Sequence, residues 1–188
     1  MAPTTRERIL HAAKELAEEH RSVTGVTISL ESVSERSGLT KPGLMYHFAS
    51  KEALMVGLVE QAAEEWDRRI RNAAGADPAD LSPFDRHRGY VRTAMTAELS
   101  RADYWIFADA LYQPSLARPW QERLASWFET DGVGPQARAL LTAARFCADG
   151  AWAAEATGVF PAEDLAAVCE RALGLVDAAE SGHGEVTA

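Results

Sequence analysis

Apolar residues recur along most of the chain every three or four positions, which is the spacing of one buried face of an α-helix. Alternating runs of β-branched residues, which would indicate strands, are missing, and Ala, Leu, Glu and Arg dominate instead. The pattern therefore predicts an all-α protein with about nine helices.

Glycines, prolines and capping residues divide this pattern into a small head and a larger bundle. Three short helices are expected in residues 1–50, and a long fourth helix joins them to a helical bundle in residues 51–180. The expected helices span about 4–21, 29–37, 40–48, 51–74, 83–99, 102–111, 119–128, 135–157 and 161–179. Residues 181–188, SGHGEVTA, are expected to form a disordered tail.

The formal net charge of −9 at first argues against a nucleic-acid partner. Its distribution changes that picture, because residues 1–51 hold 7 basic and 6 acidic side chains and the remainder holds 12 basic and 22 acidic ones. Exposed charges are screened beyond about 8 Å at physiological salt, so a neutral head can still neutralise phosphates locally. The acidic bundle should disfavour anionic membranes.

Several other classes of protein are not expected. No apolar run reaches the roughly 18 residues of a membrane span, and the N-terminus lacks the apolar stretch of a signal peptide, so a cytoplasmic location is expected. Cys147 and Cys169 are far apart and are interpreted as small buried apolar residues. Without a Ser-His-Asp set, a metal-spaced His/Cys cluster or a phosphate-cradling loop, we expect no enzyme, no metal site and no cofactor.

The segment SGLTKPGLMYHFASKEAL, residues 37–54, predicts a helix-turn-helix whose second helix enters the DNA major groove. A Gly38-Leu39 turn separates the two helices, and Thr40 is the expected N-cap of the second. Phosphates are expected at the ends of that helix, and thymine methyl groups against its apolar residues. The predicted DNA-binding residues are Ser29, Thr40, Lys41, Pro42, Gly43, Leu44, Met45, Tyr46, His47 and Lys51, whereas Phe48 is expected in the core. The alternative is that Tyr46 and His47 are packing residues and Lys51 is a solvated charge.

Large aromatic residues are abundant in the bundle, and isolated acids stand among them. An acid on an apolar helix face needs a partner, and a cationic aromatic ligand would supply one through charge pairing and cation–π contacts. The predicted ligand-binding residues are Trp66, Met95, Phe107, Asp109, Tyr112, Trp120, Trp127, Phe146, Asp149 and Trp152. The alternative is that the aromatics form the core and that Asp109 and Asp149 pair with Arg145 or Arg118.

The last two expected helices are rich in alanine and could form a four-helix interface between two copies of the chain. The residues at close-packing positions are Ala143, Ala144, Ala148, Ala151, Leu165, Val168 and Leu175. The alternative is that these helices pack only within their own chain.

The segment TKPGLMYHFASKEAL, together with the spacing of Ile9, Leu16 and Leu30 before it, resembles the TetR family of bacterial repressors over about residues 1–60. The departures are Ser34 and Ser37, where that family usually has Ala, and only a small packing cost is expected. The pieces EEWDRRIRN, ADALYQP and CADG are also similar to actinobacterial multidrug-responsive repressors of the TetR type.

This resemblance implies a homodimer that binds a palindromic double-stranded DNA operator and is released by a small-molecule inducer. Two alternatives stay open, namely a regulator that responds to a native metabolite such as a lactone or acyl compound, and a DNA-binding regulator without a ligand. The inducer, the operator and the regulated gene are not specified by the sequence.

Overall fold

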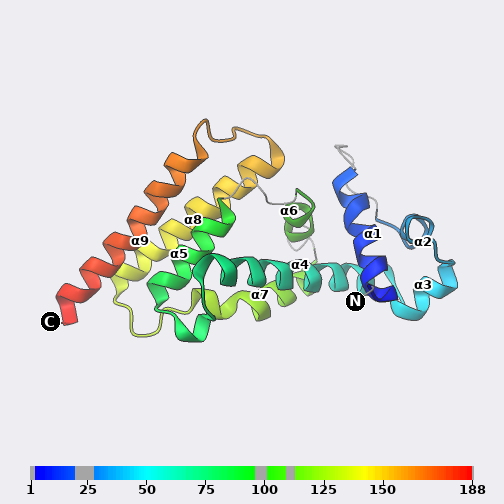
Figure 1. Ribbon diagram of the computed structural model, residues 1–188, viewed down its shortest axis with the longest axis horizontal. Coiled ribbons are helices and arrows are strands. Elements are labelled where there is room, and N and C mark those ends of the chain that lie inside the picture. Colours follow the sequence, from blue (N-terminus) through cyan, green and yellow to red (C-terminus); the bar gives the residue numbers. More distant parts are fainter. Residues whose placement is uncertain (1–2, 20–27, 96–100, 109–112, 188) are drawn as a thin grey trace. The chain divides into compact units, whose positions relative to one another are not determined.

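The computed structural model describes residues 3–19, 28–95, 101–108 and 113–187 (Figure 1). Within these ranges the secondary structure is helical throughout and contains no strand, so the predicted all-α class is confirmed. The helices are α1 (Thr5–Glu19), α2 (Leu30–Ser37), α3 (Lys41–His47), α4 (Lys51–Ala74), α5 (Pro83–Ala94), α6 (Arg101–Ala108), α7 (Pro114–Phe128), α8 (Pro135–Thr157) and α9 (Leu165–Thr187), with a short 3₁₀ helix at Pro78–Asp80.

Some helix ends differ from those expected. Helix α7 begins at Pro114 and therefore contains Pro119, which had been expected to start it. Helix α9 continues to Thr187, so the expectation of a disordered tail is wrong for residues 181–187. The ring of His183 lies 5.7 Å from that of Phe84 on α5, and this contact holds the end of α9 against its neighbour despite the low helix propensity of the nearby glycines.

The chain forms two compact units. The first comprises Met1–Glu64 with Ser100–Gln121, and the second comprises Glu65–Leu99 with Glu122–Ala188. Helices α4 and α7 each run from the first unit into the second. The start of α4 and the whole of α6 thus group with the head helices, and the division of functions between residues 1–50 and 51–180 stays a prediction.

The first unit is built on the apolar face of α1, which was predicted from its periodicity. Ile9, Ala13 and Leu16 are all buried there, against a core that also includes Val33 of α2. The two serines that depart from the TetR pattern are buried as well. Their hydroxyls donate to helix carbonyls one turn back, Ser34 to Glu31 at 2.8 Å and Ser37 to Ser34 at 3.2 Å, so neither is left unpaired.

The second unit is organised by the α8–α9 hairpin, and α5 packs against both of its helices (Figure 1). Asp67 is buried in this unit and accepts a hydrogen bond of 2.8 Å from Nε1 of Trp127 and one of 3.2 Å from Nε of Arg71. Arg88 of α5 joins α9 through Asp177 at 2.8 Å. Asp67 thus links α4 to α7 through Trp127, and Arg88 links α5 to α9, so these polar groups have partners inside the unit.

We predict that Gly57→Ala destabilises the head, because a Cβ at this position of α4 would lie 2.7 Å from Cε1 of Phe48 and 3.3 Å from Cδ2 of Leu10. The overpacking should outweigh the gain in helix propensity and lower the free energy of unfolding by about 1–2 kcal/mol. Urea unfolding followed by circular dichroism measures it.

Gly150→Ala is the matched control, since a Cβ there would meet nothing within 4 Å on the exposed side of α8. This substitution should stabilise the chain by about 0.5–1 kcal/mol. Equal stability changes in the two variants would contradict the close approach of α4 to Phe48.

Candidate functional site

Capping residues fix the beginning of both helices of the helix-turn-helix and the end of the first one. The Ser29 hydroxyl accepts from the backbone N–H of Ser32 at 3.0 Å to begin α2, and Gly38 ends this helix in the left-handed region with φ of 70°. The Thr40 side chain then accepts from the N–H of Gly43 at 3.3 Å to begin α3. The predicted turn at Gly38 and N-cap at Thr40 are confirmed. Ser29, which was predicted to contact DNA, is half-buried, and its hydroxyl is already engaged by Ser32.

The inner face of α3 is anchored in the core of the first unit. Leu44 has no exposed surface and Phe48, at the C-cap, is also buried. Phe48 was expected in the core, and this is confirmed. The prediction that Leu44 contacts thymine methyl groups is wrong, because its side chain cannot reach a partner outside the protein.

The outer face of α3 is exposed. Tyr46 keeps 87% of its surface accessible and Met45 keeps 42%, and His47 is also exposed. Tyr46 and His47 contact each other edge to face, with ring centroids 5.3 Å apart, and are not packing residues of the core. The remaining predicted residues on this side, Lys41, Pro42, Gly43 and Lys51, are exposed or half-buried.

Lys41 forms an ion pair with Glu31 of α2. The hydrogen bond from the Lys41 ammonium, with its charge, lowers the pKa of the Glu31 carboxyl. Both side chains are about half exposed, so the pair is solvated and easily exchanged for other partners. This acidic neighbour of the helix-turn-helix was not expected from the sequence.

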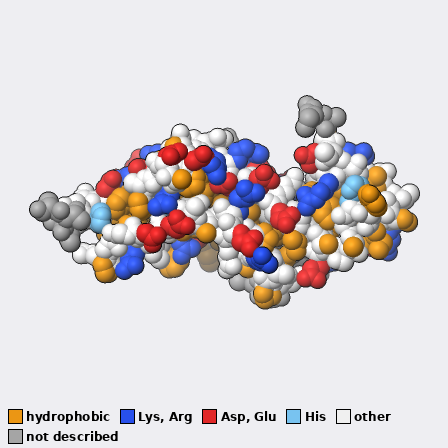
Figure 2. All heavy atoms as spheres, turned by 90° about the horizontal axis from the view of Figure 1, so that it is seen from below, with side chains coloured by type: hydrophobic (Ala, Val, Ile, Leu, Met, Phe, Trp, Pro, Cys, Tyr) orange, Lys and Arg blue, Asp and Glu red, His pale blue; other side chains and the backbone are white. Residues whose placement is uncertain are grey.

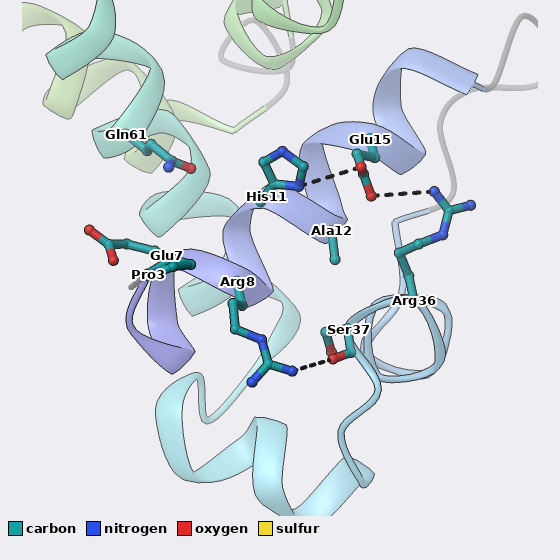
Figure 3. Close-up of a pocket in the computed structure, with 9 residues that line it drawn as sticks. All are labelled: Pro3, Glu7, Arg8, His11, Ala12, Glu15, Arg36, Ser37 and Gln61. Carbon is teal, nitrogen blue, oxygen red and sulfur yellow. Dashed lines mark hydrogen bonds and ion pairs between the residues drawn. The ribbon is translucent and has the colours of Figure 1, made fainter. Parts of the chain in front are cut away.

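A pocket of about 490 Å³ lies on the first unit among α1, the end of α2 and Gln61 of α4 (Figure 3). Polar side chains line its wall: Nδ1 of His11 lies 3.5 Å from the Glu15 carboxylate, and Glu15 forms an ion pair of 3.7 Å with Arg36. Arg8 donates to the backbone carbonyl of Ser37 at 3.1 Å, a favourable contact at the end of a helix (Figure 3). Arg8 and Arg36 thus tie α2 to α1. No local sequence signal could have revealed these two contacts, because their partners are more than twenty residues apart in the chain.

The second unit contains a cluster of aromatic rings around Trp66. Its ring centroid lies 4.6 Å from that of Trp152 and 6.0 Å from that of Tyr90, and Tyr90 contacts Phe128 at 4.8 Å. Trp66, Tyr90 and Trp152 are buried. The structure thus brings together Trp66 and Trp152, two of the predicted ligand-binding residues. Tyr90 was missed, although its position three residues after His87 places it on the inward side of α5.

Asp149 of α8 borders this cluster. Its Oδ1 accepts a 2.5 Å hydrogen bond from the Tyr90 hydroxyl, and its Oδ2 lies 3.5 Å from Nη1 of Arg145. Burial raises the pKa of the Asp149 carboxyl, although the Tyr90 hydrogen bond and the Arg145 charge oppose that shift. Burial, followed by the Asp149 charge, also raises the pKa of Tyr90. The expected alternative in which Asp149 pairs with Arg145 is confirmed as a contact.

The other predicted ligand-binding residues do not join this cluster as one set. Phe107 and Trp120 lie in the first unit, with ring centroids 5.7 Å apart. Trp127 is fully buried and its N–H is bonded to Asp67, which marks it as a core residue and not a pocket wall. Of the remaining four, Met95 is buried and Phe146 is exposed, whereas Asp109 and Tyr112 lie outside the described residues.

A second pocket, of about 330 Å³, lies in the second unit between the beginning of α8 and the end of α9. Small residues such as Gly134 and Ala178 line much of it, together with Leu140 and His183. This pocket was not expected from the sequence, because its two walls, residues 132–140 and 178–183, are far apart along the chain.

Residues 85–177 match the family described as "Tetracyclin repressor-like, C-terminal domain". The chain is therefore similar to the TetR family of transcriptional regulators over its C-terminal part. It is 33% identical over 75 residues to the HTH-type transcriptional regulator RutR of Escherichia coli strain K12, in an alignment that covers 40% of this chain and 32% of RutR. The chain therefore spans about a third of the length of this curated relative.

Solved structures share the TetR fold along nearly the whole chain. The multidrug binding protein EbrR complexed with ethidium is 23% identical, with a TM-score of 0.63 over 93% of this chain and 99% of EbrR. A TetR-family member from Streptomyces coelicolor A3 is 22% identical, with a TM-score of 0.65 over 92% of this chain and 98% of that protein. At this level of identity the likeness establishes the fold.

The remaining surface features of the chain are modest. Acidic and basic side chains are interspersed on the face shown in Figure 2. In the part of the chain that the structure describes, no group of His, Cys, Asp and Glu is arranged to hold a metal ion, and no helix could cross a bilayer. Cys147 is exposed and Cys169 is half-buried, so the interpretation of both as buried residues is wrong. The reason is that they lie on the outer sides of α8 and α9.

We predict that buried His87 makes the TetR-family fold sensitive to acid. Burial lowers its pKa from 6.5, while its Nδ1 keeps a 2.7 Å hydrogen bond with the Pro83 carbonyl. In the unfolded chain His87 binds a proton near pH 6.5, whereas in the folded chain it stays neutral at that pH. The free energy of unfolding therefore falls as the pH drops below that value.

His87→Gln should remove this component. Between pH 7.5 and 5.5 the wild-type free energy of unfolding should fall by up to about 1 kcal/mol more than that of H87Q, as measured by urea denaturation. His47→Gln, at an exposed site of α3, is the control and should follow the wild type. Parallel pH profiles for wild type and H87Q would exclude His87 as the sensitive group.

Proposed function

We propose that this chain is a ligand-responsive transcriptional repressor, and not an enzyme, that binds a palindromic operator as a homodimer and leaves it when a small cationic aromatic or lipophilic inducer binds. The observation that carries the proposal is the outer face of α3, where Tyr46, Met45 and His47 are exposed while Leu44 and Phe48 anchor the helix. The match of residues 85–177 to the tetracycline repressor-like C-terminal domain supports it.

The residues around α3 suit contact with a duplex. Lys41 and Lys51 stand just beyond the two ends of the exposed face and would neutralise phosphates, while Tyr46 and His47 would donate to phosphate or sugar oxygens. Met45 is the remaining candidate for apolar contact with a thymine methyl group. Lys41 would exchange its solvated partner Glu31 for a phosphate, at little cost.

We predict that Lys41→Gln and Lys51→Gln each weaken binding to operator and non-operator DNA alike. Each loses one phosphate contact, so the slope of log K against log salt concentration should fall by about 1 per substitution. Fluorescence anisotropy with a duplex from the chain's own promoter, between 50 and 200 mM salt, measures both quantities.

Arg138→Gln, an exposed change of equal charge on α8, is the control and should leave the slope unchanged. Undiminished affinity and slope in the K41Q/K51Q double variant would remove α3 from the DNA interface.

The outer sides of α8 and α9 support the homodimer. Phe146 is 60% exposed and Val168 is 39% exposed, which leaves apolar surface that a second copy could cover. Ala144 and Ala148 are fully buried within the chain and so serve internal packing. The proposed dimer interface therefore consists of the outward-facing residues of these helices, and Ala144 and Ala148 are no longer part of it.

The aromatic cluster beside Asp149 is the proposed site of the inducer. A partly buried carboxylate next to a cluster of aromatic rings would provide both charge and cation–π contacts to a cationic ligand. EbrR, which shares this fold, is a multidrug binding protein solved in complex with ethidium, an aromatic cation. The Arg145 contact to Asp149 favours the second candidate, in which the acid is structural and the ligand is a neutral metabolite.

Helix α4 is the proposed route of induction, since it carries Lys51 at its first residue and Trp66 further along. We predict that tetraphenylphosphonium, an aromatic cation that does not intercalate, quenches tryptophan fluorescence and weakens operator binding about 5- to 150-fold. Trp66→Phe should reduce the quenching, with Trp152 accounting for the rest, while Trp105→Phe, at an exposed site in the first unit, should leave it unchanged. Tight binding of this cation with operator affinity unchanged would contradict the induction route.

A further inference from the structure

We propose that Arg145 is a resident competitor of the inducer, an internal cation that occupies the cation site at Asp149 and must leave before a ligand cation enters. The inference rests on the proposed function, because it concerns the same site. It adds a residue that sets the affinity threshold and the charge selectivity of that site.

The surroundings of the Arg145 guanidinium have the composition of a cation site. Its Nη1 lies 3.5 Å from Oδ2 of Asp149, and its central carbon lies 5.4 Å from the ring centroid of Phe128 and 4.7 Å from that of Phe146. Both distances are within the roughly 6 Å over which an aromatic face attracts a cation. A carboxylate and two ring faces thus surround one positive charge, and all of these groups belong to the second unit.

The two partners of Asp149 are held very differently. Tyr90 is buried and donates a 2.5 Å hydrogen bond, so it fixes the carboxylate in place. Arg145 makes a longer contact, and its side chain is 33% exposed while that of Asp149 is 37% exposed. A long ion pair between partly exposed groups contributes little to stability, and Arg145 can turn its flexible side chain into solvent. Arg145 is therefore the exchangeable partner and Tyr90 the permanent one.

This difference has a consequence for ligand affinity. When a side chain of the protein occupies a ligand site for part of the time, only the empty fraction of molecules can bind. The apparent affinity for ligand is reduced by that fraction. A ligand cation with aromatic groups restores both the charge pairing and the ring contacts that Arg145 gives up. A neutral ligand restores only the ring contacts and leaves the Asp149 carboxylate with Tyr90 but without a cationic partner, in a partly buried place where that is unfavourable. The exchange therefore selects for positive charge.

His87 provides an independent report on the charge in this site. Its ring lies 6.0 Å from that of Phe128, and its pKa is lowered by burial first and then by the charges of Arg145 and Arg86. When Arg145 is neutralised, the pKa of His87 should rise. When a ligand cation takes the place of Arg145, the pKa should return toward its wild-type value, because the positive charge near the ring is restored.

The test compares wild type, Arg145→Gln, Arg145→Lys and Asp149→Asn, with Arg138→Gln as a control of equal charge change on the same helix. Tetraphenylphosphonium and its neutral analogue triphenylphosphine oxide are titrated into each protein at pH 7.5 without DNA, by calorimetry. R145Q should bind the cation about 3- to 10-fold more tightly than wild type, while R145K and R138Q should bind it as wild type does. D149N should bind it at least about 10-fold more weakly. The neutral analogue should bind wild type more weakly than the cation does, and it should also gain affinity in R145Q, because it too must displace Arg145.

The outcomes separate this inference from the proposed function. If wild type binds the cation and releases operator DNA but R145Q binds it equally or less tightly, Arg145 is not a competitor and the receptor proposal stands. If no variant binds the cation, both proposals fail. If circular dichroism shows that R145Q does not fold, the test is made on wild type, by following the titration of His87 with NMR. Saturating cation should then leave the pKa of His87 nearly unchanged, and a downward shift would mean that Arg145 stays in the site beside the ligand.

Discussion

The burial of Leu44 and Phe48 is the constraint on which the outer face of α3 depends. A helix of seven residues is too short to be stable alone in water, so its orientation is set by what it buries. Leu44 fills the core of the first unit, and Phe48 packs where Gly57 lets α4 approach closely. With these two side chains fixed, the helix has only one remaining face, and that face carries Tyr46.

Carboxylates set among apolar groups organise the second unit in two different ways. Asp67 is buried and bonded to Trp127 and Arg71, so its charge is fully committed to the packing of α4 and α7. Asp149 has one fixed partner, Tyr90, and one exchangeable partner, Arg145. Because an ionised group inside a protein must keep a partner, the first arrangement is structural and the second leaves room for another cation. The same residue type thus has two roles, decided by the exposure of its partners.

Several site residues could be predicted from the sequence and several could not. The turn at Gly38, the cap at Thr40 and the burial of Phe48 follow from local residue chemistry, and the structure agrees. Leu44 and Met45 are adjacent apolar residues in a helix of two turns, and periodicity over so short a span does not fix which of them points inward. The aromatic residues of the bundle failed in the same way, since composition alone does not separate the core residue Trp127 from the cluster around Trp66.

The sequence by itself determined the helical class, most helix boundaries and the helix-turn-helix, because these depend on capping, glycine conformation and the periodicity of apolar residues within a few turns. It also determined the TetR resemblance, which rests on a contiguous motif. Only the tertiary structure decided that Leu44 is buried, that Tyr90 holds Asp149, and that α9 continues beyond residue 181. Each of these features depends on residues that are far apart in the chain. Packing and the need to pair buried polar groups bring these residues together, and no local sequence pattern specifies either effect.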